Sequence, residues 1–170
     1  LCGWAPPGMA AEAGDAGEGG PWPRPGRQAM IDARMIGLFD SGVGGLSVWR
    51  ELVALRPEIA TLYVADSAHL PYGPRPPAEV RQFSIAISGF LISRGATVVV
   101  VACNSASAAA LHDLRRAFPG TPIVGMEPAV KPAALRSRTR TVGVLATPAT
   151  FSGRLYADLV ERWGEGLRIE

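Results

Sequence analysis

The segment TVVVVACNSASAAALHDL, residues 97–114, decides the fold of this chain. It runs from an unbroken β-branched segment into an alanine-rich one, and Cys103 stands at the junction. The valine run predicts a buried parallel strand and the Ala/Leu segment predicts a helix, so Cys103 is placed where strand becomes helix. In open α/β sheets this carboxyl edge is where ligands bind. Cysteine is also a small hydrophobe that is commonly buried, so its position alone leaves a structural and a functional explanation open.

The same strand-then-helix pattern repeats along the chain from residue 36 onward. The helical segments carry apolar residues at helical spacing, for example Leu46, Trp49 and Val53, which is typical of helices packed on a core. Five such units predict an α/β fold, a mostly parallel sheet flanked by helices on both faces. The expected strands are residues 35–39, 61–65, 97–102, 122–126 and 141–146, and the expected helices are residues 45–55, 77–91, 105–118, 128–136 and 150–163.

The two ends of the chain differ from this pattern. Residues 1–34 are rich in Gly, Pro and Ala and lack periodicity, so we expect a disordered N-terminal extension. Met30 and Met35 stand just before the first strand. Residues 1–29 are therefore a candidate for sequence read upstream of the true start site, which would be Met30 or Met35. Residues 167–170 barely begin a final strand, so we expect the chain to be cut in mid-fold.

Composition and charge argue against several classes of function. The chain has 17 basic and 15 acidic residues and no run of five like charges, so we predict neither a nucleic-acid nor an acidic-lipid partner. Its two cysteines and two histidines form no cluster, which predicts no disulfide framework, no metal site and a cytoplasmic location. No apolar window approaches the length of about 18 residues that a membrane span needs, and no secretory signal is recognisable. The expected partner is a small soluble molecule.

The loops that follow the expected strands converge on one edge if all five strands share one sheet. Their carboxylates, hydroxyls, thiol and backbone N–H groups suit a small zwitterion. The glycine loop DSGVGG, residues 40–45, matches neither the dinucleotide nor the P-loop fingerprint, so its glycines serve either binding or a tight turn. The single lysine, Lys131, lies between prolines in an expected helix, which argues against pyridoxal chemistry. No cofactor is predicted.

Four motifs together resemble one family. IGLFDSGVGGLSV, PYG, VVACNSAS and VGVLATPAT occur in the order and at the spacing seen in the cofactor-independent glutamate racemases of the aspartate/glutamate racemase superfamily. The resemblance covers residues 36–160. It implies an isomerase that interconverts L- and D-glutamate by two-base proton transfer and supplies D-glutamate for the peptidoglycan cell wall. It also implies a homodimer, a first α/β domain at residues 35–125 and the beginning of a second at residues 126–170.

The resemblance implies roles for particular residues. Cys103 matches the first of the family's two catalytic cysteines, each of which removes or delivers the α-proton on one face of the substrate. Asp40 and Ser41 match a pair that contacts the substrate, and the aspartate also assists proton transfer. The implied substrate-binding set is Asp40, Ser41, Tyr72, Gly73, Asn104 and Ser105, to which we add Thr150 as a donor from the TPAT loop.

The position of Cys103 also suits proton transfer on physical grounds. A thiol at a helix N-terminus becomes more thiolate-like, so we expect its pKa to be lowered toward the working pH. Donors on Asn104 and Ser105 would stabilise the charge that spreads into the substrate carboxylate.

One departure from the family pattern leaves alternatives open. Family members carry a second cysteine, followed by Thr and His, and no cysteine follows Cys103 in this sequence. The alternatives are a one-cysteine member of the superfamily, such as an aspartate racemase or a decarboxylase, and an inactive fragment that binds glutamate. We expect this polypeptide alone to lack full racemisation.

Overall fold

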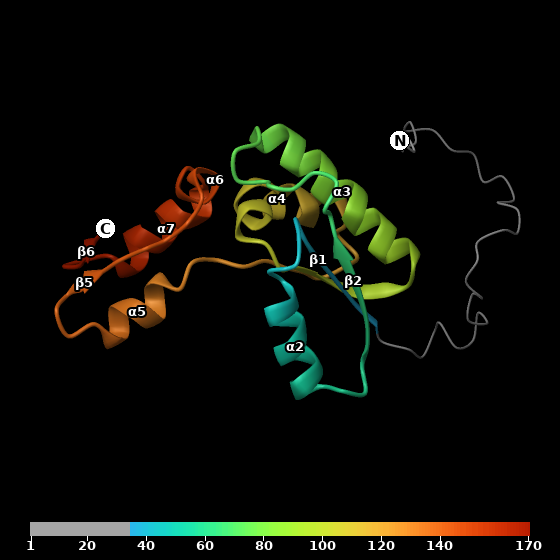
Figure 1. Cartoon of the computed structure of the whole chain (residues 1–170), viewed down its shortest axis with the longest axis horizontal. Coiled ribbons are helices and arrows are strands. Elements are labelled where there is room, and N and C mark those ends of the chain that lie inside the picture. Colours follow the sequence, from blue (N-terminus) through green and yellow to red (C-terminus); the bar gives the residue numbers. More distant parts are fainter. Residues whose placement is uncertain (1–34) are drawn as a thin grey trace, which may run out of the picture. The chain divides into compact units, whose positions relative to one another are not determined.

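The computed structural model describes residues 35–170 as strands alternating with helices (Figure 1). The expected disordered extension at residues 1–34 lies outside the described residues. The strands are β1 (Met35–Asp40), β2 (Ala60–Ala65), β3 (Ala96–Val101), β4 (Ile123–Val124), β5 (Thr141–Val142) and β6 (Arg168–Ile169). The helices are α2 (Leu46–Leu55), α3 (Pro77–Ser93), α4 (Asn104–Ala117), α5 (Val130–Arg136), α6 (Pro148–Phe151) and α7 (Arg154–Trp163).

The main sheet is parallel, as predicted. Its four strands lie in the order β2-β1-β3-β4, so β1 is hydrogen-bonded to β2 on one side and to β3 on the other. The helices α3 and α4 pack on each other, and α3 also contacts β1 and β3. The α/β fold class is therefore confirmed, and the valine run of β3 forms an interior strand of the sheet.

The last two strands do not join the main sheet, so the condition that all expected strands share one sheet is not met. β5 pairs in parallel with β6, and these two form a separate two-stranded sheet. β4 and β5 are also shorter than expected, with two residues each. Gly125 follows β4 and Gly143 follows β5 directly, and glycine weakens a strand because it has no side chain to pack and costs more backbone entropy. Hydrophobic alternation alone did not reveal these early ends.

The core lies between the main sheet and the pair α3 and α4. Phe39, Val99 and Val101 of the strands are fully buried against Leu91 of α3 and Leu114 of α4. Two of the four residues in the buried stripe of α3 are serines, and these small side chains let α4 pack closely against the helix. This core fixes the ends of β1 and β3, where the predicted site residues lie.

Ser88, within that stripe, is a polar residue without a partner. Its side chain is 0% exposed, and its Oγ has no hydrogen-bond partner among the described residues. We expect Ser88→Ala to raise the free energy of unfolding by about 1 kcal/mol, because it removes an unsatisfied buried hydroxyl and alanine favours helix. Urea denaturation measures the change. Ser84→Ala, one turn earlier, is the matched control, because the Ser84 hydroxyl donates to the Val80 carbonyl at 2.7 Å. An equal gain in both variants would contradict the prediction.

Candidate active site

The predicted site residues begin where β1 and β3 end. The Ala102 N–H donates to the Phe39 carbonyl at 2.8 Å, which carries the β1–β3 pairing up to the residue before Cys103. The Cys103 thiol donates to the Ser41 hydroxyl, with 3.8 Å between sulfur and oxygen. The structure thus brings Cys103 and the Asp40–Ser41 pair together at one edge of the sheet.

Asp40 is held by the backbone of the loop that follows it. Its carboxylate accepts the Ser41 N–H at 2.7 Å on Oδ1 and the Gly45 N–H at 2.9 Å on Oδ2. The Ser41 hydroxyl also donates to Oδ1, at 3.3 Å. The side chain is buried, with 7% of its surface exposed. Both oxygens therefore have fixed partners, and the carboxylate points toward the start of α2.

Gly45 is needed for close approach. Its φ is −65°, a conformation open to any residue, so the backbone there does not demand glycine. A Cβ on Gly45 would lie 2.8 Å from the Ala102 Cβ and 2.8 Å from the Tyr63 hydroxyl. The tight-turn explanation is therefore unnecessary at this position, and the absence of a side chain lets the loop lie against Tyr63 of β2 and Ala102, which follows β3.

Cys103 caps α4 with its sulfur. It has extended backbone dihedrals, and its Sγ accepts the Ala106 N–H at 3.5 Å. Burial raises the pKa of this thiol above its ordinary value, and the negative charge of Asp40 adds to the rise. Hydrogen bonds from the Ala106 and Ser41 backbone act in the opposite direction but are weaker than the effect of burial. The expected lowering of the pKa is wrong, because the helix N-terminus is outweighed by the 7% exposure of the side chain.

Three hydroxyls gather beside the first turn of α4. Ser105 Oγ lies 3.0 Å from Thr147 Oγ1, which lies 3.3 Å from Thr150 Oγ1. Ser105 and Thr150 are buried, whereas Thr147 and the neighbouring Asn104 are exposed. Thr147 joins the two predicted residues and was missed from the sequence, although it lies in the TPAT loop that drew attention to Thr150. Thr147 is the exposed member of this cluster.

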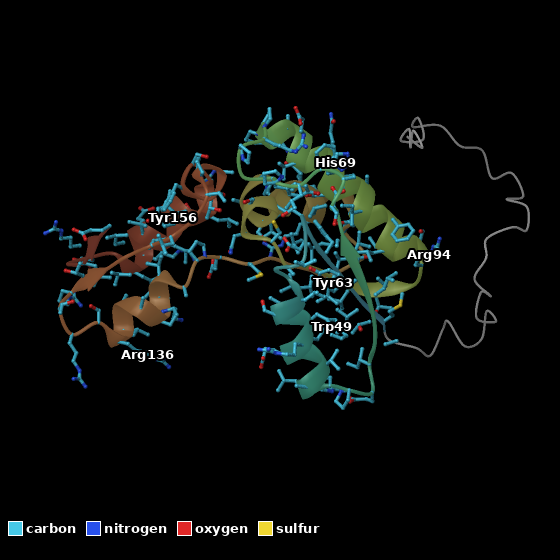
Figure 2. The ribbon with its side chains drawn as sticks, in the orientation of Figure 1. Trp49, Tyr63, His69, Arg94, Arg136 and Tyr156 are labelled. Carbon is cyan, nitrogen blue, oxygen red and sulfur yellow. The ribbon has the colours of Figure 1, made fainter. Side chains whose placement is uncertain are left out.

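The Tyr72 side chain is buried and bonded to another residue of the segment between β2 and α3. It is 1% exposed, and its hydroxyl donates to Asp66 Oδ2 at 2.6 Å. Burial and this hydrogen bond both raise the pKa of the tyrosine. Asp66 also accepts His69 Nδ1 at 2.8 Å, and His69 stacks on Phe83 with 3.9 Å between ring centroids. Figure 2 labels His69 on the segment between β2 and α3. Sequence reasoning assigned no role to Asp66 or His69, which anchor this loop.

Gly73 brings that loop against Thr147. A Cβ on Gly73 would lie 2.8 Å from both Cβ and Cγ2 of Thr147. We expect Gly73→Ala to lower the free energy of unfolding by about 1–3 kcal/mol, because the added methyl must displace Thr147 and the hydroxyls bonded to it. Chemical denaturation measures this loss. Gly120→Ala is the control, since a Cβ there has no neighbour within 4 Å. Equal losses in the two variants would show that the close contact is unimportant.

Neither a candidate metal cluster nor a helix that could span a membrane is present among the described residues. Within residues 35–170 no group of three or more His, Cys, Asp and Glu side chains could hold a metal ion. None of the helices described is long and apolar enough to cross a membrane. Lys131 is the only lysine of the sequence, and its Nζ lies 4.5 Å from the centre of the Trp163 ring.

Comparisons with known proteins agree on one family. A family model described as Asp/Glu/Hydantoin racemase matches residues 44–169. The glutamate racemase of Roseiflexus sp. is 58% identical over 137 residues, which are 81% of this chain and 50% of that protein. The glutamate racemase of Pseudomonas aeruginosa is 46% identical over 139 residues, 82% of this chain and 52% of that protein. The chain spans about half the length of the curated relatives it matches.

Solved structures give the same result. The structure of Escherichia coli glutamate racemase in complex with L-glutamate and the activator UDP-MurNAc-Ala is similar with a TM-score of 0.75 and 37% identity, over 81% of this chain and 52% of that one. Glutamate racemase from Aquifex pyrophilus gives a TM-score of 0.72 and 38% identity, over 80% of this chain and 53% of that one. Since the family model also covers most of the described residues, the chain belongs to the Asp/Glu/Hydantoin racemase family.

Proposed function

We propose that this chain carries the first half of a cofactor-independent glutamate racemase site. The observation that carries the proposal is the thiol of Cys103 at the N-terminus of α4, in contact with Ser41 and beside the fixed carboxylate of Asp40. A thiol and a neighbouring carboxylate can transfer a proton to or from a carbon centre. The relatives and solved structures that match over about four-fifths of the chain are glutamate racemases, which supports glutamate as the substrate.

In this proposal Cys103 removes or returns the α-proton on one face of glutamate. The thiol is the acid form at neutral pH because burial raises its pKa, so this half-site is suited to delivering a proton. Removal requires the thiolate, which the Ala106 and Ser41 N–H groups stabilise. Asp40 lies next to the sulfur and assists the transfer near the substrate ammonium group. Ser41 orients the sulfur through the contact between the two side chains.

The proposed carboxylate site is made of hydroxyls and N–H groups. Negative charge that develops at Cα spreads into the α-carboxylate, and preorganised donors there lower the barrier. Asn104 and Ser105 stand directly after Cys103, and Thr150 is linked to Ser105 through Thr147. Because the Tyr72 hydroxyl is committed to Asp66, we assign the substrate contact of the Tyr72–Gly73 segment to its backbone.

Several broader features belong to the same proposal. They are a cytoplasmic location, a role in supplying D-glutamate for peptidoglycan, and a homodimer. The proposed domains are residues 35–125 and 126–170, and the four-stranded and two-stranded sheets fall on either side of that division. The site residues named here need no cofactor for a proton transfer of this kind.

The proposal is tested by binding and isotope exchange. We expect D- or L-glutamate to perturb the NMR signals of residues 40–45 and 103–105, and deuterium from the solvent to appear at its Cα. L- and D-aspartate are the comparison ligands, because the one-cysteine alternatives include an aspartate racemase. Preference for aspartate would favour that alternative. Binding of glutamate without any exchange would select the inactive-fragment alternative over the proposed activity.

A further inference from the structure

We propose that Tyr63 is a positioning residue, which fixes the Asp40 carboxylate through the loop at residues 42–45. Tyr63 lies on β2, on the opposite side of β1 from Cys103, and belongs to none of the motifs that marked the site. The inference rests on the proposed function in so far as it concerns glutamate. Its structural part concerns only the hydroxyl of Tyr63 and the backbone of the loop.

One face of β2 contacts both the loop at residues 42–45 and α2, the helix that follows this loop. Side chains alternate along a strand, so Thr61 and Tyr63 share a face, whereas Leu62 and Val64 pack against the core on the other. Thr61 Oγ1 accepts the Trp49 Nε1–H at 2.9 Å, which ties α2 to the strand. Tyr63 donates its hydroxyl hydrogen to the Gly42 carbonyl at 3.2 Å. Figure 2 labels Trp49 and Tyr63 near β2 and α2.

The Tyr63 hydroxyl also reaches the other end of the loop. The position of a Cβ on Gly45 is 2.8 Å from this oxygen, so the hydroxyl is packed against Gly45 as well as bonded to Gly42. The Gly45 N–H is the donor that holds Asp40 Oδ2. A single side chain thus restrains both ends of the segment whose backbone fixes the carboxylate.

The electrostatic surroundings of Tyr63 agree with this placement. The pKa of Tyr63 is raised to about 12, mainly by burial and in smaller part by Asp40 and by the thiolate form of Cys103. The phenol therefore lies within electrostatic reach of both groups of the proposed proton transfer. Because it stays protonated, it remains a hydrogen-bond donor to Gly42 throughout the neutral range.

Tyr63→Phe tests the inference, because it removes the hydroxyl and keeps the ring. We expect hydrogen exchange of the Gly45 amide, followed by NMR on the whole chain, to become about tenfold faster, which is the effect of losing one hydrogen bond of ordinary strength. The amide of Val99, in the fully buried part of β3, reports global unfolding in the same sample. A general loss of stability would accelerate both amides equally. Thr61→Val is the matched control, since it breaks the bond to Trp49 and leaves the Tyr63 hydroxyl in place.

The effect of Tyr63 on the proposed proton transfer is measured as deuterium incorporation into glutamate by the same variants. We expect Tyr63→Phe to slow deuterium incorporation at the glutamate Cα at least tenfold, and Thr61→Val to change it less than threefold. The inference is overturned if Tyr63→Phe leaves the hydrogen-exchange rate of the Gly45 amide unchanged relative to that of Val99. It is also overturned if the Gly45 amide alone exchanges faster while deuterium enters glutamate at the full rate. If the unmodified chain neither binds nor exchanges glutamate, the proposed function fails. The comparison of the two amides then still decides whether Tyr63 holds the loop.

Discussion

Replacing Cys103 with serine is expected to slow exchange of the glutamate α-proton by about 10²- to 10⁴-fold, the usual contribution of one positioned acid or base. A serine hydroxyl ionises far above the working pH, so the variant has no group on that face to take the proton. Proton NMR of glutamate in deuterated buffer measures the rate. The same chemical change at the other cysteine, Cys2→Ser, is the control, because Cys2 belongs to none of the site motifs.

The fold of the Cys103→Ser variant should be preserved. The sulfur caps α4 by accepting the Ala106 N–H, and serine is a preferred residue at that position of a helix. We therefore expect a thermal midpoint close to that of the unmodified chain. Full exchange activity with serine at position 103 would refute the assignment of the thiol. A collapsed melting transition would instead show that the loss of activity is a loss of structure.

We expect conversion between the enantiomers of glutamate to be largely lost, because residues 35–170 contain only one thiol. Inversion at a carbon centre needs one group to take the proton from one face and another to return a proton to the opposite face. Cys103 serves one face, so we expect deuterium to enter one enantiomer of glutamate and negligible conversion to the other. The expected loss of conversion is about 10²- to 10⁴-fold relative to a site with both groups.

Chiral chromatography separates the two outcomes. The purified chain is incubated with L-glutamate and with D-glutamate in deuterated buffer, and both the isotope content and the enantiomer ratio are measured. Isotope entry in one enantiomer without a change of ratio is the expected result. Rapid approach to equal amounts of L- and D-glutamate would mean that a group other than a second thiol serves the opposite face.

The main sheet could be predicted from the sequence because its strands have strong local signals. The valine run of β3 and the alanine-rich α4 differ so clearly in side-chain shape that the junction at Cys103 was located correctly. β5 was predicted too long. A final strand was expected to begin at residues 167–170, where β6 lies, but the pairing of β5 with β6 joins two short and distant strands and leaves no local pattern in the sequence.

The sequence predicted those site residues whose position is determined by where a strand ends. Asp40 and Cys103 were placed at one edge because parallel strands end together. Thr147 was missed because its role depends on contacts with Ser105 and Thr150, and Tyr63 because it acts through the backbone of another segment. The raised pKa of Cys103 could not be foreseen either. The helix N-terminus is visible in the sequence, whereas burial of the sulfur depends on the packing of the whole core.

The contact between Cys103 and Ser41 joins residues that are 62 positions apart in the chain. No local segment can hold these two side chains together, since their approach requires β1 and β3 to be paired. Closing a loop of that length costs chain entropy before any contact compensates for it, so we expect this part of the site to form late in folding. The same dependence applies in the folded protein. Opening of the β1–β3 pair would separate the two side chains, whereas the position of the Asp40 carboxylate also depends on the loop at residues 42–45.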